Sequence, residues 1–335
     1  MLKGAFIGFG NVAAKGHMPG WRARNDARIV AATDAALSRR EAFLAACPDG
    51  RWHATVDDLL SSEKLDFVDV CAPPGSHAAL IERAFRAGLH VLSEKPLVTR
   101  VEDAKRVAAS AAGAGRVLHT VHNWLHAPLC RKISALVDDG AIGPVRGVRW
   151  RTLRTQPAIA VSADGVANWR VDAEQAGGGI LSDHGWHALY CVTRWAGVPA
   201  GVAARLETRR FHDQRLEDTA DLALDTAAGV SHIFLTWAAD ERSNAIEIEG
   251  EKGAICVIGD AVVLKSNGRE RRWTSPSLSE GSHHPDWFGG VAADFLAAAR
   301  GGAKSNLNDA VLCARLIDAA QRSSAAGGVR LALAG

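Results

Sequence analysis

The chain has 335 residues, of which 47% are hydrophobic and 23% charged, and its formal net charge at pH 7 is +2. Because domains usually hold roughly 100–200 residues each, this length predicts about two globular domains. So small a net charge does not indicate a nucleic-acid or membrane partner. No apolar run approaches the roughly 18 residues that span a bilayer.

The six cysteines are scattered and form no Cys-x-x-Cys pair, so neither a zinc site nor another metal site is expected. Sparse cysteines in a long chain are typical of a reducing compartment. The first apolar stretch is short and ends in a glycine turn, unlike a secretory signal. We therefore expect a cytoplasmic protein.

Strands and helices alternate through the first third of the chain, which predicts a doubly wound parallel sheet of the Rossmann type. Ser76 is the expected cap of one helix, with Gly88 just after its end, and Thr99 with Glu102 forms a capping box for the next. The predicted strands are 2–7, 28–33, 67–72, 90–93 and 117–121, and the predicted helices are 12–24 (irregular at Pro19), 37–47, 55–60, 77–87 and 100–112.

The pattern changes after residue 122, where a series of short strands joined by turns predicts consecutive hairpins. The predicted strands are 144–154, 201–210, 219–225, 230–237, 244–250, 254–258, 262–265 and 270–273, and the helices are 129–139, 179–195, 287–300 and 308–323. The fold class is therefore α/β. We predict a dinucleotide-binding Rossmann domain over 1–122 and an α+β domain with a large, mostly antiparallel open sheet over 123–335.

A dinucleotide-binding turn follows the first strand directly. The letters Gly8-Phe9-Gly10-Asn11-Val12-Ala13 match the pattern G-x-G-x-x-G/A before a helix. Gly8 permits a tight turn, Gly10 lets the backbone approach a pyrophosphate, and the helix amino terminus attracts phosphate charge. We expect Gly8, Phe9, Gly10, Asn11 and Val12 to contact the cofactor.

Asp34 ends the second strand, where a carboxylate can accept both ribose hydroxyls of NAD and repel the 2′-phosphate of NADP. NAD is the expected cofactor, with NADP the less favoured alternative because Arg39 and Arg40 lie nearby. Asp34 as a simple helix cap is the competing interpretation.

Two further segments are expected beside the cofactor. Ala72 and Pro73 end the third core strand in a rigid loop, and His77 in the next helix faces either the cofactor or solvent. Lys95, in Glu94-Lys95-Pro96, lies at the carboxyl end of an apolar strand, which points it into the crevice where parallel sheets bind ligands. Glu94 is expected to contact the cofactor or Lys95.

In the second domain, three consecutive glycines lead into a helix that carries Asp183 and His187. Residues four apart share one helix face, so these two side chains are predicted neighbours. Such a pair alone is usually a surface ion pair. Its occurrence together with a nucleotide turn and a crevice lysine favours an active site.

These motifs resemble the Gfo/Idh/MocA oxidoreductases, which include glucose-fructose oxidoreductase and inositol dehydrogenases. The resemblance covers both domains in order and implies that Lys95, Asp183 and His187 form the catalytic set. It implies that the second-domain sheet often forms an oligomer interface, so a homodimer or homotetramer is expected. A cis bond before Pro96 fits the resemblance, although most X-Pro bonds are trans.

The implied reaction moves a hydride between C4 of the nicotinamide and a secondary hydroxyl or carbonyl of a sugar, sugar acid or cyclitol. The proton needs a base with a pKa near the working pH, which suits His187 with Asp183 orienting it. Lys95 can stabilise the alkoxide, relay the proton or act as the base itself. The sequence leaves these roles open.

The substrate pocket is less clearly written in the sequence. The family segment often carries an arginine and an aromatic residue where this chain has Leu125 and His126. Candidate substrate contacts are Asn123, Trp124, His126, Trp169, Arg170 and His187. His283 and His284 belong to a loop or a plain helix start. The alternative functions are a non-catalytic dinucleotide-binding sensor and a dihydrodiol-type or imine-reducing enzyme.

Overall fold

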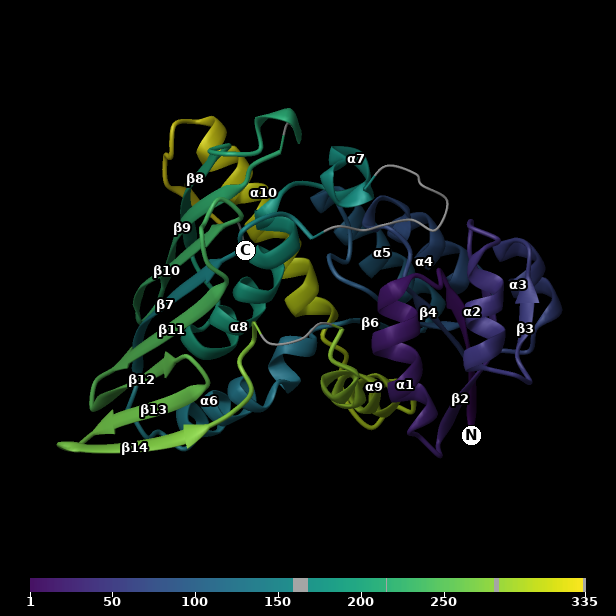
Figure 1. The fold of residues 1–335 in the computed structure, drawn as a ribbon, viewed down its shortest axis with the longest axis horizontal. Coiled ribbons are helices and arrows are strands. Elements are labelled where there is room, and N and C mark those ends of the chain that lie inside the picture. The colour runs from purple at the N-terminus through teal and green to yellow at the C-terminus, as the bar shows by residue number, and fades with distance from the viewer. Residues whose placement is uncertain (159–167, 215, 280–282, 334–335) are drawn as a thin grey trace.

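The computed structural model describes residues 1–158, 168–214, 216–279 and 283–333. Two sheets lie side by side, with helices between them (Figure 1). The first sheet is entirely parallel, in the order β3-β2-β1-β4-β5-β6. Its strands are β1 Leu2–Ile7, β2 Ala27–Thr33, β3 Arg51–His53, β4 Phe67–Val70, β5 His90–Ser93 and β6 Leu118–Thr120. The chain therefore has the predicted Rossmann architecture.

Helices cover both faces of this sheet, which explains why its central strands are mostly apolar, with Asp69 of β4 as a buried exception. They are α1 Met18–Arg22, α2 Arg39–Ala46, α3 Val56–Ser62, α4 His77–Arg86 and α5 Val101–Ala114. A π-helical turn, η1 Ala13–His17, runs directly into α1, so the irregularity expected near Pro19 is present.

Two predicted helix caps are wrong, and one is confirmed. The Ser76 hydroxyl donates to the Pro73 carbonyl (2.8 Å) instead of capping α4. No capping box forms before α5, whose N-cap is Arg100 without a side-chain hydrogen bond. Gly88 has the expected positive φ (74°). Ser76 does not cap α4 because the turn brings the Pro73 carbonyl close to the Ser76 hydroxyl, which binds this carbonyl instead.

The second sheet has nine strands in the order β14-β13-β12-β11-β7-β10-β9-β8-β15. It is antiparallel except where β7 pairs with β10, so the predicted mostly antiparallel sheet is confirmed. Its strands are β7 Val145–Leu153, β8 Gly201–Glu207, β9 Thr219–Thr226, β10 Gly229–Thr236, β11 Ser243–Gly250, β12 Gly253–Ile258, β13 Ala261–Ser266, β14 Arg269–Thr274 and β15 Leu331–Ala332. The short strands β3 and β15 were not predicted.

Helices α8 and α10 pack on the face of this sheet that looks toward the Rossmann half (Figure 1). The remaining helical segments are α6 Pro128–Asp138, α7 Ala173–Ala176, α8 Trp186–Ala196, α9 Pro285–Ala299, α10 Leu307–Ala325 and the short turns η2 Pro74–Ser76, η3 Asn123–His126, η4 Trp169–Val171, η5 Leu181–Gly185 and η6 His212–Gln214. Within the described ranges, no helix has the length and apolar character needed to cross a bilayer.

Helix α9 joins the two halves of the chain. Phe288 and Phe295 of α9 are buried in one core with Phe6, Trp21 and Phe67 of the Rossmann half. The C-terminal part of the chain therefore contributes to the N-terminal core. The division at residue 122 stays a prediction, with α9 packed across it.

Candidate active site

The glycine turn lies at the carboxyl end of β1, next to the carboxyl end of β4 at the centre of the first sheet. Gly8 has φ +91°, and a Cβ there would lie 2.8 Å from the backbone nitrogen of Ala72, so a larger residue does not fit. A Cβ at Gly10 would meet no protein atom within 4 Å. This open space lies just before the helix that begins at Asn11, where a phosphate can bind. The residues present therefore fit a dinucleotide.

Asp34 stabilises this turn. Its Oδ2 accepts the Phe9 backbone N–H (2.6 Å) and its Oδ1 accepts that of Ala36 (2.8 Å). The Phe9 ring itself is fully buried against Phe6 and Phe43. The expectation that Phe9 contacts the cofactor is therefore wrong for its side chain, because an aromatic ring beside an apolar core is buried there.

His77 lies neither on the cofactor side nor in solvent, so both predicted positions are wrong. Its ring is fully buried, with Nδ1 on the Pro96 carbonyl (3.0 Å) and Nε2 on the Ala72 carbonyl (2.8 Å). It ties together two of the loops that border the cofactor crevice. The Lys95–Pro96 peptide bond in one of these loops is cis.

Lys95 and Asp183 meet across the two halves of the chain. Lys95 Nζ donates to Asp183 Oδ1 (3.0 Å) and to the Asp183 carbonyl (2.8 Å). Arg170 Nη1 also donates to Oδ1 (3.1 Å), and His184 Nδ1 lies 3.2 Å from Oδ2. Burial alone would raise the pKa of Asp183, but Lys95, His184 and Arg170 together lower that pKa well below its usual value.

His187 has a different partner from the predicted one. Its Nδ1 lies 2.7 Å from the Tyr190 hydroxyl, which also accepts the Trp124 backbone N–H (3.0 Å). Its ring stacks on Trp124, with centroids 4.5 Å apart. Asp183 lies in the π-helical turn η5 just before α8, and the extra residue of such a turn changes the helical register. Among the described residues, the hydrogen-bond partner of His187 is therefore Tyr190, and the expected orienting of His187 by Asp183 is not found.

Burial, and then the charges of Lys95 and His184, lower the pKa of His187 well below 6.5. Burial also raises the pKa of Tyr190 well above its ordinary value. At neutral pH the imidazole is thus uncharged and the phenol keeps its proton. An uncharged imidazole can act as a base, which is the state that alcohol oxidation needs.

A second buried network holds the loop of Lys95 from behind. Glu94 Oε2 accepts the Lys95 backbone N–H (2.8 Å), and Glu94 Oε1 lies 3.0 Å from His17 Nε2. His17 Nδ1 lies 2.9 Å from Asp69 Oδ2, and the ring stacks on Phe288 of α9. Since both ring nitrogens face carboxylates, the ring must carry two protons to donate to both.

Electrostatics agree with a charged His17. Burial lowers its pKa, but Asp69 and Cys71 raise it more, so the pKa lies well above 6.5. Ligand atoms of His17, Asp69 and Cys71 lie within 4.8 Å of one another, a spacing that could hold a metal ion. Burial, and then Asp69, raise the pKa of the Cys71 thiol above its ordinary value.

The sequence analysis missed this network. The available signal was Asp69, a carboxylate in the middle of the apolar strand β4, because a buried charge needs a partner. The position of its partner, His17, depends on how the first helix packs. Sequence spacing alone does not supply that information.

The catalytic candidates line one cleft of about 470 Å³ between the two halves. Several predicted contacts share it: Val12, Ala72, Glu94, Lys95, Asn123, Trp124, Trp169, Arg170, Asp183, His187, His283 and His284. His126 lies elsewhere, because its Nε2 pairs with Asp294 of α9 (3.3 Å), so its expected place in the cleft is wrong. The guanidinium of Arg170 lies over the Trp169 ring.

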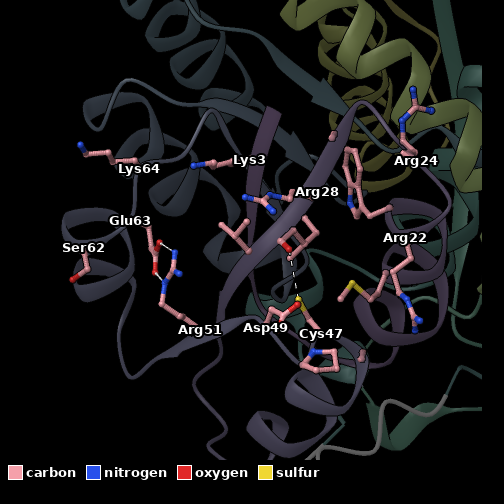
Figure 2. Close-up of a pocket in the computed structure, with 17 residues that line it drawn as sticks. Lys3, Arg22, Arg24, Arg28, Cys47, Asp49, Arg51, Ser62, Glu63 and Lys64 are labelled. Atoms are coloured by element: carbon pink, nitrogen blue, oxygen red, sulfur yellow. Dashed lines mark hydrogen bonds and ion pairs between the residues drawn. The ribbon is translucent and has the colours of Figure 1, made fainter. Parts of the chain in front are cut away.

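A larger cavity, of about 650 Å³, lies away from these residues (Figure 2). Its lining mixes apolar side chains with basic ones such as Lys3, Arg22 and Arg28, which come from β1, α1 and β2, and we call it the basic cavity. Its lining shares no residue with the cleft that holds Lys95, Asp183 and His187. Size therefore does not identify the functional site of this protein.

Comparison with known proteins agrees with this geometry. Residues 2–122 match the family described as oxidoreductase family, NAD-binding Rossmann fold, and residues 130–256 match the GFO/IDH/MocA C-terminal domain. The chain belongs to the Gfo/Idh/MocA oxidoreductase family. It is accordingly an NAD(P)-dependent oxidoreductase that acts on CH–OH groups.

Relatives of this oxidoreductase extend over most of its length. Inositol 2-dehydrogenase from Rhizobium meliloti is 27% identical over 332 residues, which cover 95% of this chain and 96% of that protein. D-apiose dehydrogenase from Paraburkholderia graminis is 29% identical over 77% of this chain and 68% of its own. An oxidoreductase from Agrobacterium radiobacter, solved with NAD+, L-tartaric acid and magnesium, shares the fold (TM-score 0.85, 23% identity, 99% and 98% covered).

Proposed function

We propose that the protein oxidises a secondary hydroxyl group of a sugar, sugar acid or cyclitol, or reduces the matching carbonyl, with NAD as the preferred cofactor. The observation that carries this proposal is the meeting of Lys95 with Asp183 in a cleft that His187 also lines, beside the glycine turn. NAD, when bound, supplies the hydride acceptor. Asp34 favours NAD over NADP because its carboxylate would repel a 2′-phosphate.

The roles of the side chains follow from their partners. His187 can donate Nδ1–H to the Tyr190 oxygen, which leaves the lone pair of Nε2 for the substrate hydroxyl proton. Lys95 is held by Asp183 and by the backbone bond to Glu94, so its ammonium group has a defined position. It stabilises the negative charge that develops on the substrate oxygen. Asp183 is the positioning residue for Lys95.

The relatives support the substrate class. They are named for inositol and D-apiose, which are both polyhydroxylated. The cleft suits such a molecule because an aromatic wall, Trp124 and Trp169, stands beside polar side chains such as Asn123. Its volume lies within the range of small-ligand sites.

A panel assay tests this function. Purified protein is incubated with NAD+ or NADP+ and a set of sugars, sugar acids and cyclitols, and reduced cofactor is followed by absorbance. We expect turnover on at least one compound and a higher kcat/KM with NAD+ than with NADP+. Thermal shift with each cofactor reports binding independently of turnover. Binding of NAD without turnover on any compound would instead support a sensor function.

We also propose that the enzyme forms a homodimer or homotetramer through the outer face of the second sheet. That face carries interleaved charges, such as Arg149 beside Glu247 and Glu249, so a self-complementary contact can form between two copies. Light scattering after size-exclusion chromatography measures the molar mass of the oligomer. The Arg149→Glu variant should have a lower mass than wild type. A monomeric wild type would contradict the proposal.

A further inference from the structure

Arg154, which follows β7, is a buried cation in the wall of the cleft. Its side chain is almost fully buried, with 3% exposed. Nη1 donates to the carbonyl oxygens of Leu153 (2.7 Å) and Ser243 (3.0 Å), and Nη2 donates to Asn244 Oδ1 (3.3 Å). All three acceptors are neutral. A buried guanidinium is normally paired with an acid, because an uncompensated buried charge is unfavourable.

No acid plays that part among the residues the structure describes. The one carboxylate that raises the pKa of Arg154 is Asp183, and it is already bonded to Lys95 and Arg170. Burial and the charge of Arg242 lower the pKa of Arg154 to about 10, so the guanidinium stays positive at neutral pH. Among the described residues, the positive charge of Arg154 in the cleft wall is therefore left without a neutralising acid.

Two of the donors of Arg154 are unused. A guanidinium has five N–H groups, and the described hydrogen bonds employ three of them. Nε has no partner, and one N–H of Nη2 remains. Nε and Nη2 are adjacent nitrogens that can bind the two oxygens of one carboxylate. The unused pair therefore matches a carboxylate better than it matches a single hydroxyl.

A second arginine faces the same part of the cleft. Arg242 precedes β11 and lines the cleft with Arg154, and its Nε donates to the Ser279 carbonyl (3.0 Å). It forms no ion pair with an acid within the described ranges. Burial, and then the charge of Arg242, lower the pKa of Arg154, because like charges repel. A negative group between them removes this repulsion.

We propose that Arg154 and Arg242 form a subsite for a carboxylate of the substrate. This inference rests on the proposed function and narrows its substrate class to small polyhydroxy acids, such as aldonates and uronates. A carboxylate is favoured over a phosphate because of the negative charge of Asp183, whose field reaches Arg154. This charge repels a dianion more strongly than a monoanion. The two groups touch the substrate away from the reacting carbon, where they set specificity.

Matched pairs of compounds test the subsite. NADH formation is measured with glucose and glucuronate, galactose and galacturonate, gluconate, and the corresponding sugar 6-phosphates. We expect kcat/KM for the acids to exceed that for the neutral sugars by about 10- to 100-fold, the effect of one or two hydrogen bonds to a charged group. The Arg154→Gln variant should lose most of this preference through a higher KM for the acid.

Two variants keep the experiment decisive. Arg242 is exposed, so Arg242→Gln should fold and should lose about 3- to 10-fold on the acid with little change on the neutral sugar. Arg86→Gln removes an equal charge from an exposed position on α4 and should keep the preference. If Arg154→Gln does not fold, Arg242→Gln alone decides.

The outcomes separate the subsite from the function. Equal turnover of acids and neutral sugars overturns the subsite and leaves the proposed function standing. Preference for the phosphates overturns the choice of carboxylate. If no compound is turned over, the proposed function fails, and thermal shift of the NAD complex decides the subsite: glucuronate or gluconate must stabilise wild type, and Arg242→Gln must respond less. No shift in wild type overturns the subsite.

Discussion

The two main cavities of this protein differ in how their charges are arranged. In the cleft, Lys95 and Asp183 have side chains that are 14% and 17% exposed, and they join the two halves of the chain. In the basic cavity the charged side chains come from neighbouring elements (Figure 2), and Lys3, Arg22 and Arg28 are exposed. The side chain of Arg51, for example, is 62% exposed and pairs locally with Glu63.

This difference bears on which cavity suits chemistry. Burial lowers the pKa of His187, and the charges of Lys95, His184 and Arg170 lower that of Asp183 against the effect of its burial. Exposed charges are screened by solvent and contribute little. We therefore propose that burial and cross-domain contact, rather than volume, mark the active site. The following predictions test that comparison.

The largest expected effect is at Lys95. The Lys95→Ala variant should lower kcat by about 10³-fold, because it removes a fixed charge that stabilises the developing alkoxide. NAD binding, measured by thermal shift, should stay nearly unchanged. Lys105→Ala, at an exposed position on α5, is the matched control. Full turnover by Lys95→Ala on the true substrate would show that the assignment of this residue is wrong.

His187→Gln should lower kcat by about 10²- to 10³-fold, because it removes the proposed base. Since the pKa of His187 is lowered well below 6.5, the imidazole stays neutral at mildly acidic pH. The pH profile of kcat/KM in wild type should therefore hold down to below about pH 6.5 before it falls. An acidic limb centred above that pH would contradict the assignment of His187.

Tyr190→Phe should have a smaller effect on turnover and a measurable effect on stability. Loss of the hydroxyl leaves the buried Trp124 N–H without its acceptor, which costs about 1–3 kcal/mol of unfolding free energy. His187 also loses its orienting partner, so kcat should fall about tenfold. Urea denaturation and steady-state kinetics measure the two effects. Unchanged kcat would show that Tyr190 does not position His187.

His17 predicts a pH dependence of stability. Its pKa in the folded state is raised above the value near 6.5 of the unfolded chain, so its contribution is full below that pH and is lost as pH rises through the folded pKa. The unfolding free energy of wild type should therefore fall as pH rises above about 6.5, the ordinary pKa of histidine. The His17→Gln variant should show a flatter profile. Equal slopes of unfolding free energy against pH in wild type and in His17→Gln would rule out a charged His17.

The smallest effect is expected in the basic cavity. Arg28 is exposed, so Arg28→Gln should change the unfolding free energy by less than about 0.5 kcal/mol and leave kcat/KM unchanged. The same assays that detect Lys95→Ala check this. A large loss of activity would show that the basic cavity takes part in the reaction and that burial of charge does not identify the active site.

Most elements and several site residues were predictable because they depend on local chemistry. Gly8 is required by a tight turn at positive φ, Gly10 belongs to the same glycine pattern, and Lys95 follows from its place at the end of a parallel strand. His77, His126 and Phe9 were misplaced. In each case the side chain found a partner distant in sequence, such as Asp294 for His126.

The alternation of strands and helices, the glycine turn and the Glu94-Lys95-Pro96 and Asp183…His187 motifs determine by themselves a Rossmann oxidoreductase with a second, antiparallel-sheet domain. Tertiary structure alone decided which distant groups pair: the Tyr190 hydroxyl with the Trp124 backbone N–H, and His17 between Asp69 and Glu94. It also left Arg154 without an acid among the residues that the structure describes. The physical reason is that residue spacing sets the periodicity of an element, whereas a buried hydrogen bond depends on which elements pack together.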